Sequence, residues 1–143
     1  MKNLLRLEEI AQFLVCVFAL ITSDVSWWMY LILALGPDIG MLGYLVNSKV
    51  GAFSYNLLHH KGIALLVVAL SIPSMIEVMT LWSTDMGTLH ATPPLLLGII
   101  LFGHASMDRI FGYGLKFGDN FHHTHLGWIG RGKVASGKVE VGE

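Results

Sequence analysis

Charged side chains are scarce in this sequence. Only 13% of its 143 residues are Asp, Glu, Lys or Arg, whereas 54% are apolar and the mean hydropathy is +0.63. Soluble domains carry about a quarter charged residues, and a globular fold of this length exposes more surface than so few charges can cover. The formal net charge of −1 provides no positive field for a phosphate backbone. The composition therefore predicts an integral membrane protein and excludes a nucleic-acid partner.

Cysteine is nearly absent as well, since Cys16 is the only one. A disulfide within the chain and a cluster of thiolates are therefore excluded. What the sequence does contain is apolar runs of the length that a bilayer requires, about 20 residues per helix. Four such runs can be placed, over residues 4–21, 25–46, 50–72 and 92–113.

These runs predict an all-α fold, in which a polytopic membrane protein packs four transmembrane helices into one compact bundle. Residues 1–129 are expected to form this single domain. The segment 130–143 is Gly-rich and short of large apolar groups, so we expect a flexible cytoplasmic tail there.

The basic residues fall on one side of the predicted membrane. The segment from Pro73 to Ala91 carries Glu77 and Asp85 but no Lys or Arg. With four spans, the positive-inside rule then places both termini in the cytoplasm. The nine basic residues of that side are Lys2, Arg6, Lys49, Lys61, Arg109, Lys116, Arg131, Lys133 and Lys138. We therefore expect a multi-pass protein whose surroundings are membrane lipid.

Three ionisable side chains lie deep inside the predicted spans. Such a group in hydrocarbon costs at least ~2.5 kcal/mol, so each one needs a partner or a function. Asp38, His59 and His104 each lie about nine residues from the cytoplasmic end of a different span. At the rise of a helix, this is a depth of roughly 13 Å. The spacing therefore predicts that one carboxylate and two imidazoles meet at one depth.

Further candidate ligands lie close by. Asp108 follows His104 by four residues, so both side chains share one helix face. His125 lies on the same side of the membrane, in the loop after the last span. Imidazole and carboxylate are the ligands of Zn²⁺, Fe²⁺ and Mn²⁺, and we place Zn²⁺ first. The predicted metal ligands are Asp38, His59, His104, Asp108 and His125.

A divalent metal site beside the bilayer suits hydrolysis of an ester or amide bond in a lipid-type substrate, because a bound metal ion yields a nucleophilic water near neutral pH. In this hypothesis the protein is a metal-dependent membrane hydrolase. Asp38 binds the ion or orients the water, and Tyr55 or Arg109 steadies the developing oxyanion.

A structural interpretation fits the same residues. Asp38 can pair with Arg109, and the histidines can donate to helix carbonyls or to Tyr55, as polar contacts commonly join membrane helices. Pro37 leaves the carbonyl of Leu33 without its helical donor, and Asp38 can cap the helix that follows such a break. In this interpretation the protein is a non-catalytic accessory subunit or a helix-packing protein.

The glycines of the second span indicate where a partner helix could pack. Gly36, Gly40 and Gly43 give that helix a small-residue face on which another helix can pack closely. The face suits a membrane-complex partner or a second copy of the chain.

A third interpretation of the polar residues is haem or another tetrapyrrole held by paired imidazoles, and a fourth is a path for protons or ions.

Four segments resemble a small bacterial membrane family, known as the domain of unknown function 4260. They are Gly36–Tyr44, Gly51–His59, His104–Lys116 and Thr124–Gly127, and the likeness runs from about Leu4 to Ile129. The resemblance implies a bacterial cytoplasmic-membrane protein and supplies no reaction. The family pattern includes Asp38, His59, His104, Asp108, Arg109 and His125, whereas His122 and His123 stand where other residue types are usual. As a type of site, the set is also similar to membrane-embedded zinc hydrolases of the alkaline ceramidase type.

Overall fold

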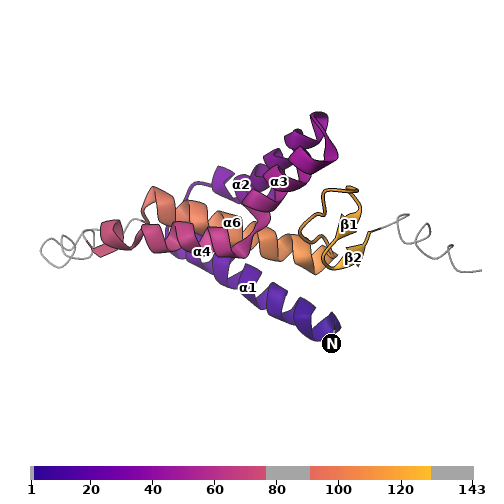
Figure 1. Cartoon of the computed structure of the whole chain (residues 1–143). Coiled ribbons are helices and arrows are strands. Elements are labelled where there is room, and N and C mark those ends of the chain that lie inside the picture. Colours follow the sequence, from indigo (N-terminus) through magenta and orange to yellow (C-terminus); the bar gives the residue numbers. More distant parts are fainter. Residues whose placement is uncertain (1, 77–90, 130–143) are drawn as a thin grey trace, which may run out of the picture.

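The computed structural model describes residues 2–76 and 91–129 (Figure 1). Within them the regular structure is helical except for one short pair of strands and one isolated bridge, so the predicted all-α class is confirmed. The predicted flexible tail over 130–143 lies outside the described residues. The elements are α1 (Lys2–Thr22), α2 (Trp28–Leu35), the 3₁₀ helix η1 (Gly36–Leu45), α3 (Ser48–His59), α4 (Lys61–Leu70), α6 (Pro93–Phe111), β1 (His123–Thr124) and β2 (Gly127–Trp128).

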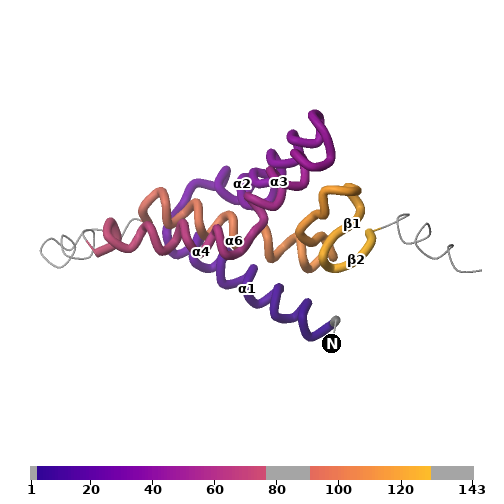
Figure 2. The backbone as a smooth tube through the Cα atoms, in the orientation of Figure 1, coloured from indigo at the N-terminus to yellow at the C-terminus, as the bar shows by residue number. Residues whose placement is uncertain are grey.

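The helices form two groups. In the first group, α1 and α4 both pack along α6. In the second group, η1 packs against α3 as a hairpin that leans away from the first, as the tube in Figure 2 shows. A small core of Leu20, Leu33 and Ile100 joins α1, α2 and α6. The N-terminus, the turn between η1 and α3, and the strands all lie toward one end of the molecule (Figure 1).

Two predicted spans are broken rather than continuous. The span predicted over 25–46 changes from α2 to η1 at Gly36, because Pro37 at the start of η1 cannot donate the next α-helical hydrogen bond. The span predicted over 50–72 breaks between α3 and α4, which are bent by 49°. The backbone of His60 is extended at this point, with φ −86° and ψ 110°.

Among the described helices, two are long and apolar enough to cross a membrane, Trp28–Leu45 and Pro93–Phe111. The bent pair of α3 and α4 gives a third candidate span if the two helices are counted as one broken span. The helix α1 is not among them, since Arg6, Glu8 and Glu9 lie in its N-terminal half. The last span matches its predicted bounds closely, because Pro93 opens α6 and Gly112, with φ +90°, ends it.

The close packing of η1 on α3 depends on glycine. A Cβ on Gly40 would lie 2.8 Å from the backbone oxygen of Ser54, and one on Gly43 would lie 2.9 Å from that of Val50. The Ser54 hydroxyl also donates to the carbonyl of Gly40 at 2.6 Å. By contrast, a Cβ on Gly36 would meet only the Ile32 side chain, one turn earlier in α2. The predicted small-residue face is therefore used within the chain by two of its three glycines.

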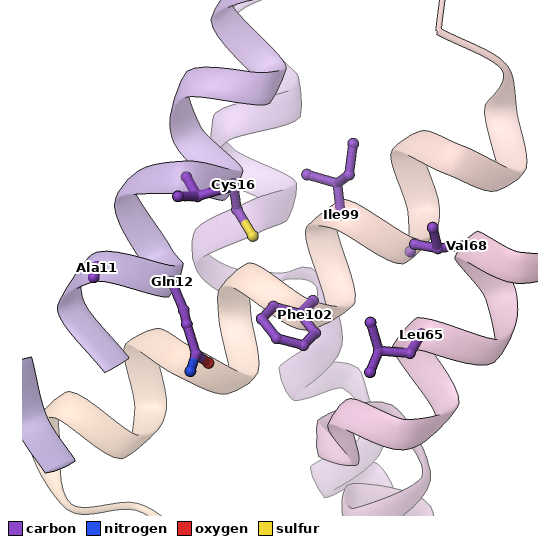
Figure 3. A pocket seen from close by; sticks show the side chains of 9 residues that line it. Ala11, Gln12, Cys16, Leu65, Val68, Ile99 and Phe102 are labelled. Carbon is purple, nitrogen blue, oxygen red and sulfur yellow. The ribbon is translucent and has the colours of Figure 1, made fainter. Parts of the chain in front are cut away.

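An apolar cavity of about 300 Å³ lies between α1, α4 and α6 (Figure 3). Its wall includes Cys16, Leu65, Val68 and Phe102, and Gln12 is a polar residue at its edge. Phe102 and His104 are two residues apart on α6 and point to different faces of that helix. The cavity is therefore separate from the histidines.

Candidate metal centre

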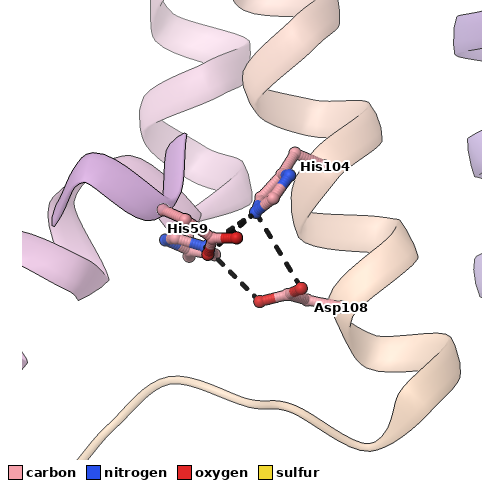
Figure 4. Close-up of side chains that lie close together, drawn as sticks. His59, His104 and Asp108 are labelled. Atoms are coloured by element: carbon pink, nitrogen blue, oxygen red, sulfur yellow. Dashed lines mark hydrogen bonds and ion pairs between the residues drawn. The ribbon is translucent and has the colours of Figure 1, made fainter. Parts of the chain in front are cut away.

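The fold brings Asp38, His59, His104 and Asp108 together. Asp38 comes from η1, His59 is the last residue of α3, and the other two lie one turn apart on α6 (Figure 4). One ligand atom from each residue lies within 4.8 Å of the others. The predicted convergence of residues from three helices is therefore present in the structure. The helix η1 follows the first of the two helix breaks, and α3 precedes the second. The cluster forms where these two elements approach α6.

Hydrogen bonds fix the orientation of both imidazoles. His104 Nδ1 lies 2.8 Å from the carbonyl of Leu33, and His59 Nδ1 lies 2.8 Å from the carbonyl of Tyr55. A carbonyl can only accept, so each Nδ1 carries the hydrogen and donates. The neutral form of each ring then has its lone pair on Nε2, which faces the other cluster residues. The Leu33 carbonyl is the one that Pro37 leaves free, and His104 supplies its donor.

The atoms that meet in the cluster are all acceptors. The two Nε2 atoms are 3.0 Å apart. Asp38 Oδ1 lies 3.5 Å from Nε2 of His59 and 3.4 Å from Nε2 of His104. Carboxylate oxygens of Asp108 lie 3.4 Å and 3.9 Å from the same two nitrogens. Lone pairs repel one another, so either a proton on one imidazole or a metal ion bound among the four side chains would stabilise this arrangement.

The spacing and the burial fit a divalent metal ion. Four ligands placed tetrahedrally around Zn²⁺ at about 2.0–2.1 Å stand roughly 3.3 Å apart, which is close to the distances in this cluster. Asp38 Oδ1 is buried and has no hydrogen-bond donor among the described residues. The His104 side chain is fully buried, whereas that of Asp38 is 34% exposed. A metal ion here would be enclosed on the histidine side and accessible on the Asp38 side.

Tyr55 supports two of the four residues. Its hydroxyl donates to Asp108 Oδ2 at 2.5 Å, and its ring stacks on the His59 ring with centroids 3.7 Å apart. Groups that orient metal ligands in this way commonly decide metal affinity. The structure therefore places Tyr55 beside the cluster, as predicted, with its hydroxyl directed at a carboxylate.

Arg109 points toward α1 instead of toward the cluster. Its guanidinium lies 3.5 Å from Glu9 Oε1, and Lys61 Nζ also bonds to Glu9 and to Gln12. The alternative pairing of Asp38 with Arg109 is not formed, because the contacts of Asp38 are with the two imidazoles. The sequence did not predict that Glu9 pairs with two cations, because Lys61 and Arg109 belong to α4 and α6, which are far from Glu9 in the sequence.

His125 lies outside the four-residue group. The backbone N–H of Leu115 donates to His125 Nδ1 at 2.8 Å, so this nitrogen carries no hydrogen. Partial burial, together with the nearby charge of Arg109, lowers the pKa of His125. The imidazole thus closes the loop that follows α6. His123 has a similar structural role, with Nδ1 2.7 Å from Asp119 and its ring stacked on Trp128.

Acidification is expected to loosen this loop. Because the pKa of His125 is lowered in the folded protein, the unfolded chain binds the proton more readily, and stability falls as the pH drops below about 6.5. Amide hydrogen exchange at Leu115, corrected for the intrinsic rate, should lose protection between about pH 6.5 and 5. In His125→Asn the amide oxygen accepts without titrating, so protection should not change with pH. Constant protection of Leu115 in the unaltered protein would contradict this account.

The sequence analysis missed two residues near the cluster. Lys116 is 3% exposed although it lies beyond the last span. Asn56 holds it in place: its Oδ1 accepts from the backbone N–H of Lys116 at 2.7 Å, and its Nδ2 donates to the Lys116 carbonyl at 2.8 Å. These residues are 60 positions apart, so no local pattern in the sequence could have indicated the contact.

The fold and the site together define a class: a helical protein with helices of membrane-spanning length and a buried His/Asp group that can hold a metal ion. The chain belongs to the family described as a domain of unknown function (DUF4260), whose model matches residues 2–129. The family that the four sequence segments suggested is therefore confirmed. No curated protein and no solved structure matches the chain.

Proposed function

We propose that this protein is a divalent-metal-dependent membrane hydrolase that acts on a lipid-type substrate. The observation that carries the proposal is the meeting of two imidazole lone pairs and two carboxylates, of which Asp38 Oδ1 has no hydrogen-bond donor among the described residues. His59, His104 and Asp108 would hold the ion, with Zn²⁺ ahead of Fe²⁺ or Mn²⁺. A divalent ion held there supplies Lewis acidity and a water that ionises near neutral pH.

The residues of the chain then have separate tasks. Asp38 is the more exposed carboxylate, so it is the group that can accept a proton at the open side of the site. Tyr55 fixes the position of Asp108 through its hydroxyl and covers one face of His59 with its ring. Burial of both histidines keeps bulk water from the inner side.

We also propose that the chain crosses the membrane four times. The pairing of Glu9 with Lys61 and Arg109 supports α1 as the first span, since paired charges are less costly in a membrane than isolated ones. Large apolar side chains are exposed around the helices, as for Phe18 at 66% and Leu70 at 69%. Residues 1–129 would form the single domain, with both termini in the cytoplasm.

Metal content and lipid cleavage test the proposal together. Detergent-purified protein is expected to contain about one equivalent of a divalent ion, measured by mass spectrometry of the elements. His59→Ala should fall below about 0.2 equivalents, because one imidazole is lost from a four-ligand set. His60→Ala, which removes the adjacent exposed histidine, is the control and should keep its metal.

For activity, the same samples are reconstituted with ester-linked lipids, including a phospholipid, and with amide-linked lipids, and the release of fatty acids and of headgroups is measured. Release is expected only from the metal-loaded protein and from His60→Ala. A metal content near zero in the unaltered protein would refute the metal centre. Stoichiometric metal without release from either lipid class would refute the hydrolase.

The second candidate is a non-catalytic membrane subunit, and specific contacts favour it. His104 joins α6 to α2 through Leu33, and Tyr55 joins α3 to α6 through Asp108. In that case the chelator-treated protein would keep full stability without metal.

The haem interpretation fits less well. The axial nitrogens of a haem stand about 4 Å apart on opposite faces of the ring, whereas the Nε2 atoms of His59 and His104 lie 3.0 Å apart with a carboxylate oxygen beside them.

A further inference from the structure

Lys116 is a buried cation that the proposed reaction leaves unused. Its residue is 3% exposed, and its Nζ atom is buried without a hydrogen-bond partner among residues 2–76 and 91–129. Nζ lies among aromatic rings, 4.1 Å from the centroid of Phe121, 5.1 Å from that of Tyr55 and 5.5 Å from that of Tyr113. Rings attract an ammonium by their π faces, but they supply no hydrogen-bond acceptor.

Hydrogen bonds and strand pairing fix the backbone of Lys116, the residue that carries this ammonium. The two hydrogen bonds with Asn56 hold both the N–H and the carbonyl of Lys116, and Thr124 pairs with it from the other side. A lysine near a membrane surface ordinarily extends its amine into water. Burying an ammonium without a directly bonded counter-ion costs several kcal/mol, and contacts with aromatic rings offset only part of that cost.

Tyr55 contacts both Lys116 and the four-residue cluster. Tyr55 contacts the Lys116 ammonium by its ring, while the same ring stacks on His59 and its hydroxyl donates to Asp108. Burial lowers the pKa of Lys116, and the carboxylates of Asp108 and Asp38 act in the opposite direction. The ammonium is therefore within electrostatic range of both acidic residues of the metal centre.

The charges of the occupied site do not balance. The two carboxylates neutralise a divalent ion, and the histidines are neutral, so the ammonium of Lys116 leaves one positive charge in excess. A buried excess charge favours a ligand of opposite sign. The charge needed is that of a single oxyanion, not of a neutral ester or amide.

We propose that the metal centre and Lys116 together bind a monoanionic phosphodiester, the charged group of a phospholipid. The inference rests on the proposed metal centre and specifies the substrate class of that site. One phosphoryl oxygen would face the ion, and the negative charge would be shared with the Lys116 ammonium. Lys116 is thus a binding residue for the anionic group, and Asn56 is the residue that positions it.

The test uses the full chain in detergent, loaded with Co²⁺, whose visible absorption reports on its ligands. Dimethyl phosphate, a soluble monoanionic phosphodiester, should shift the spectrum to saturation with one ligand per ion. Trimethyl phosphate has the same tetrahedral phosphorus with one more methyl group and no charge, and it should have no effect. Inorganic phosphate and bilayer discs containing phosphatidylglycerol or diacylglycerol distinguish a free anion from a lipid headgroup. We expect phosphatidylglycerol to compete with dimethyl phosphate and diacylglycerol not to compete.

Lys116→Met removes the charge and keeps the length of the side chain. It should weaken dimethyl phosphate binding at least about 10-fold while Co²⁺ still binds. Lys49→Met, at an exposed lysine of the same end of the molecule, is the control and should bind as the unaltered protein does. If Lys116→Met does not fold, the comparison of dimethyl with trimethyl phosphate in the unaltered protein decides.

Equal binding by Lys116→Met, or an equal response to trimethyl phosphate, would overturn this inference alone. Competition by inorganic phosphate but not by phosphatidylglycerol would overturn the lipid headgroup as the source. Absence of any Co²⁺ spectrum would overturn the proposed metal centre, and this inference with it.

Discussion

Replacing His104 with alanine is expected to abolish metal binding and to destabilise the protein by about 2–4 kcal/mol. Two separate losses contribute. Nε2 leaves the group of ligand atoms, and Nδ1 no longer donates to the carbonyl of Leu33. That carbonyl has no helical donor, because residue 37 is proline, so it would remain buried and unpaired. Metal content and unfolding in a graded series of denaturing detergent measure the two losses.

Pro37→Ala separates the two roles of His104. Alanine restores a backbone N–H at this position, so the Leu33 carbonyl can be satisfied without the histidine. Measured on chelator-treated samples, His104→Ala combined with Pro37→Ala should regain about 1 kcal/mol relative to His104→Ala. Its metal content should stay as low as in the single variant. If the double variant binds metal like the unaltered protein, His104 is a structural residue and not a ligand.

Gly40→Ala is expected to weaken metal binding more than about 10-fold without changing any ligand. The added Cβ would lie 2.8 Å from the oxygen of Ser54 and 3.1 Å from the Cα of Tyr55, and neither backbone atom can move alone. Accommodation therefore requires η1 to move away from α3. Asp38 is two residues earlier on the same helix, so it would be drawn away from His59. Titration with a competing chelator measures the affinity.

Gly36→Ala is the matched control for this change. Both glycines belong to the same Gly-xxx-Gly pattern, but the Cβ at Gly36 would meet only the Ile32 side chain, at 2.8 Å, and no atom of α3. The backbone of Gly36 is helical, with φ −60° and ψ −49°, so alanine can adopt it, and the contact with Ile32 can be relieved without moving η1 away from α3. Metal affinity should stay near that of the unaltered protein. An equal loss in both variants would show that the spacing of η1 and α3 does not control the site.

The parts of the site that follow local rules could be predicted from the sequence. The pair of His104 and Asp108 follows from the helical period, and the free carbonyl of Leu33 follows from Pro37. The approach of Asp38 to the histidines could be expected because a buried carboxylate needs a partner. These expectations located the site and identified the Leu33 carbonyl as needing a donor, but they did not predict that His104 supplies it.

The parts that depend on distant contacts could not be predicted. The bend at His60 has no proline to mark it, so residues 50–72 were expected to form one helix, and the 49° angle follows from packing of α4 on α6. The partners of Arg109 and Lys116 come from elements about 100 and 60 residues away in sequence. The short strand pair depends on Gly127, whose φ of +108° allows a turn that sequence periodicity does not reveal.

The order of the four cluster residues along the chain has a consequence for biogenesis. Asp38 and His59 emerge from the ribosome before His104 and Asp108, which belong to the last helix of the described chain. A nascent chain therefore holds only two of the four cluster residues until α6 is inserted beside them. With the proposed metal centre, ion capture would be the closing event of assembly, and a shortage of the ion would leave newly made chains as incompletely assembled targets for membrane quality control.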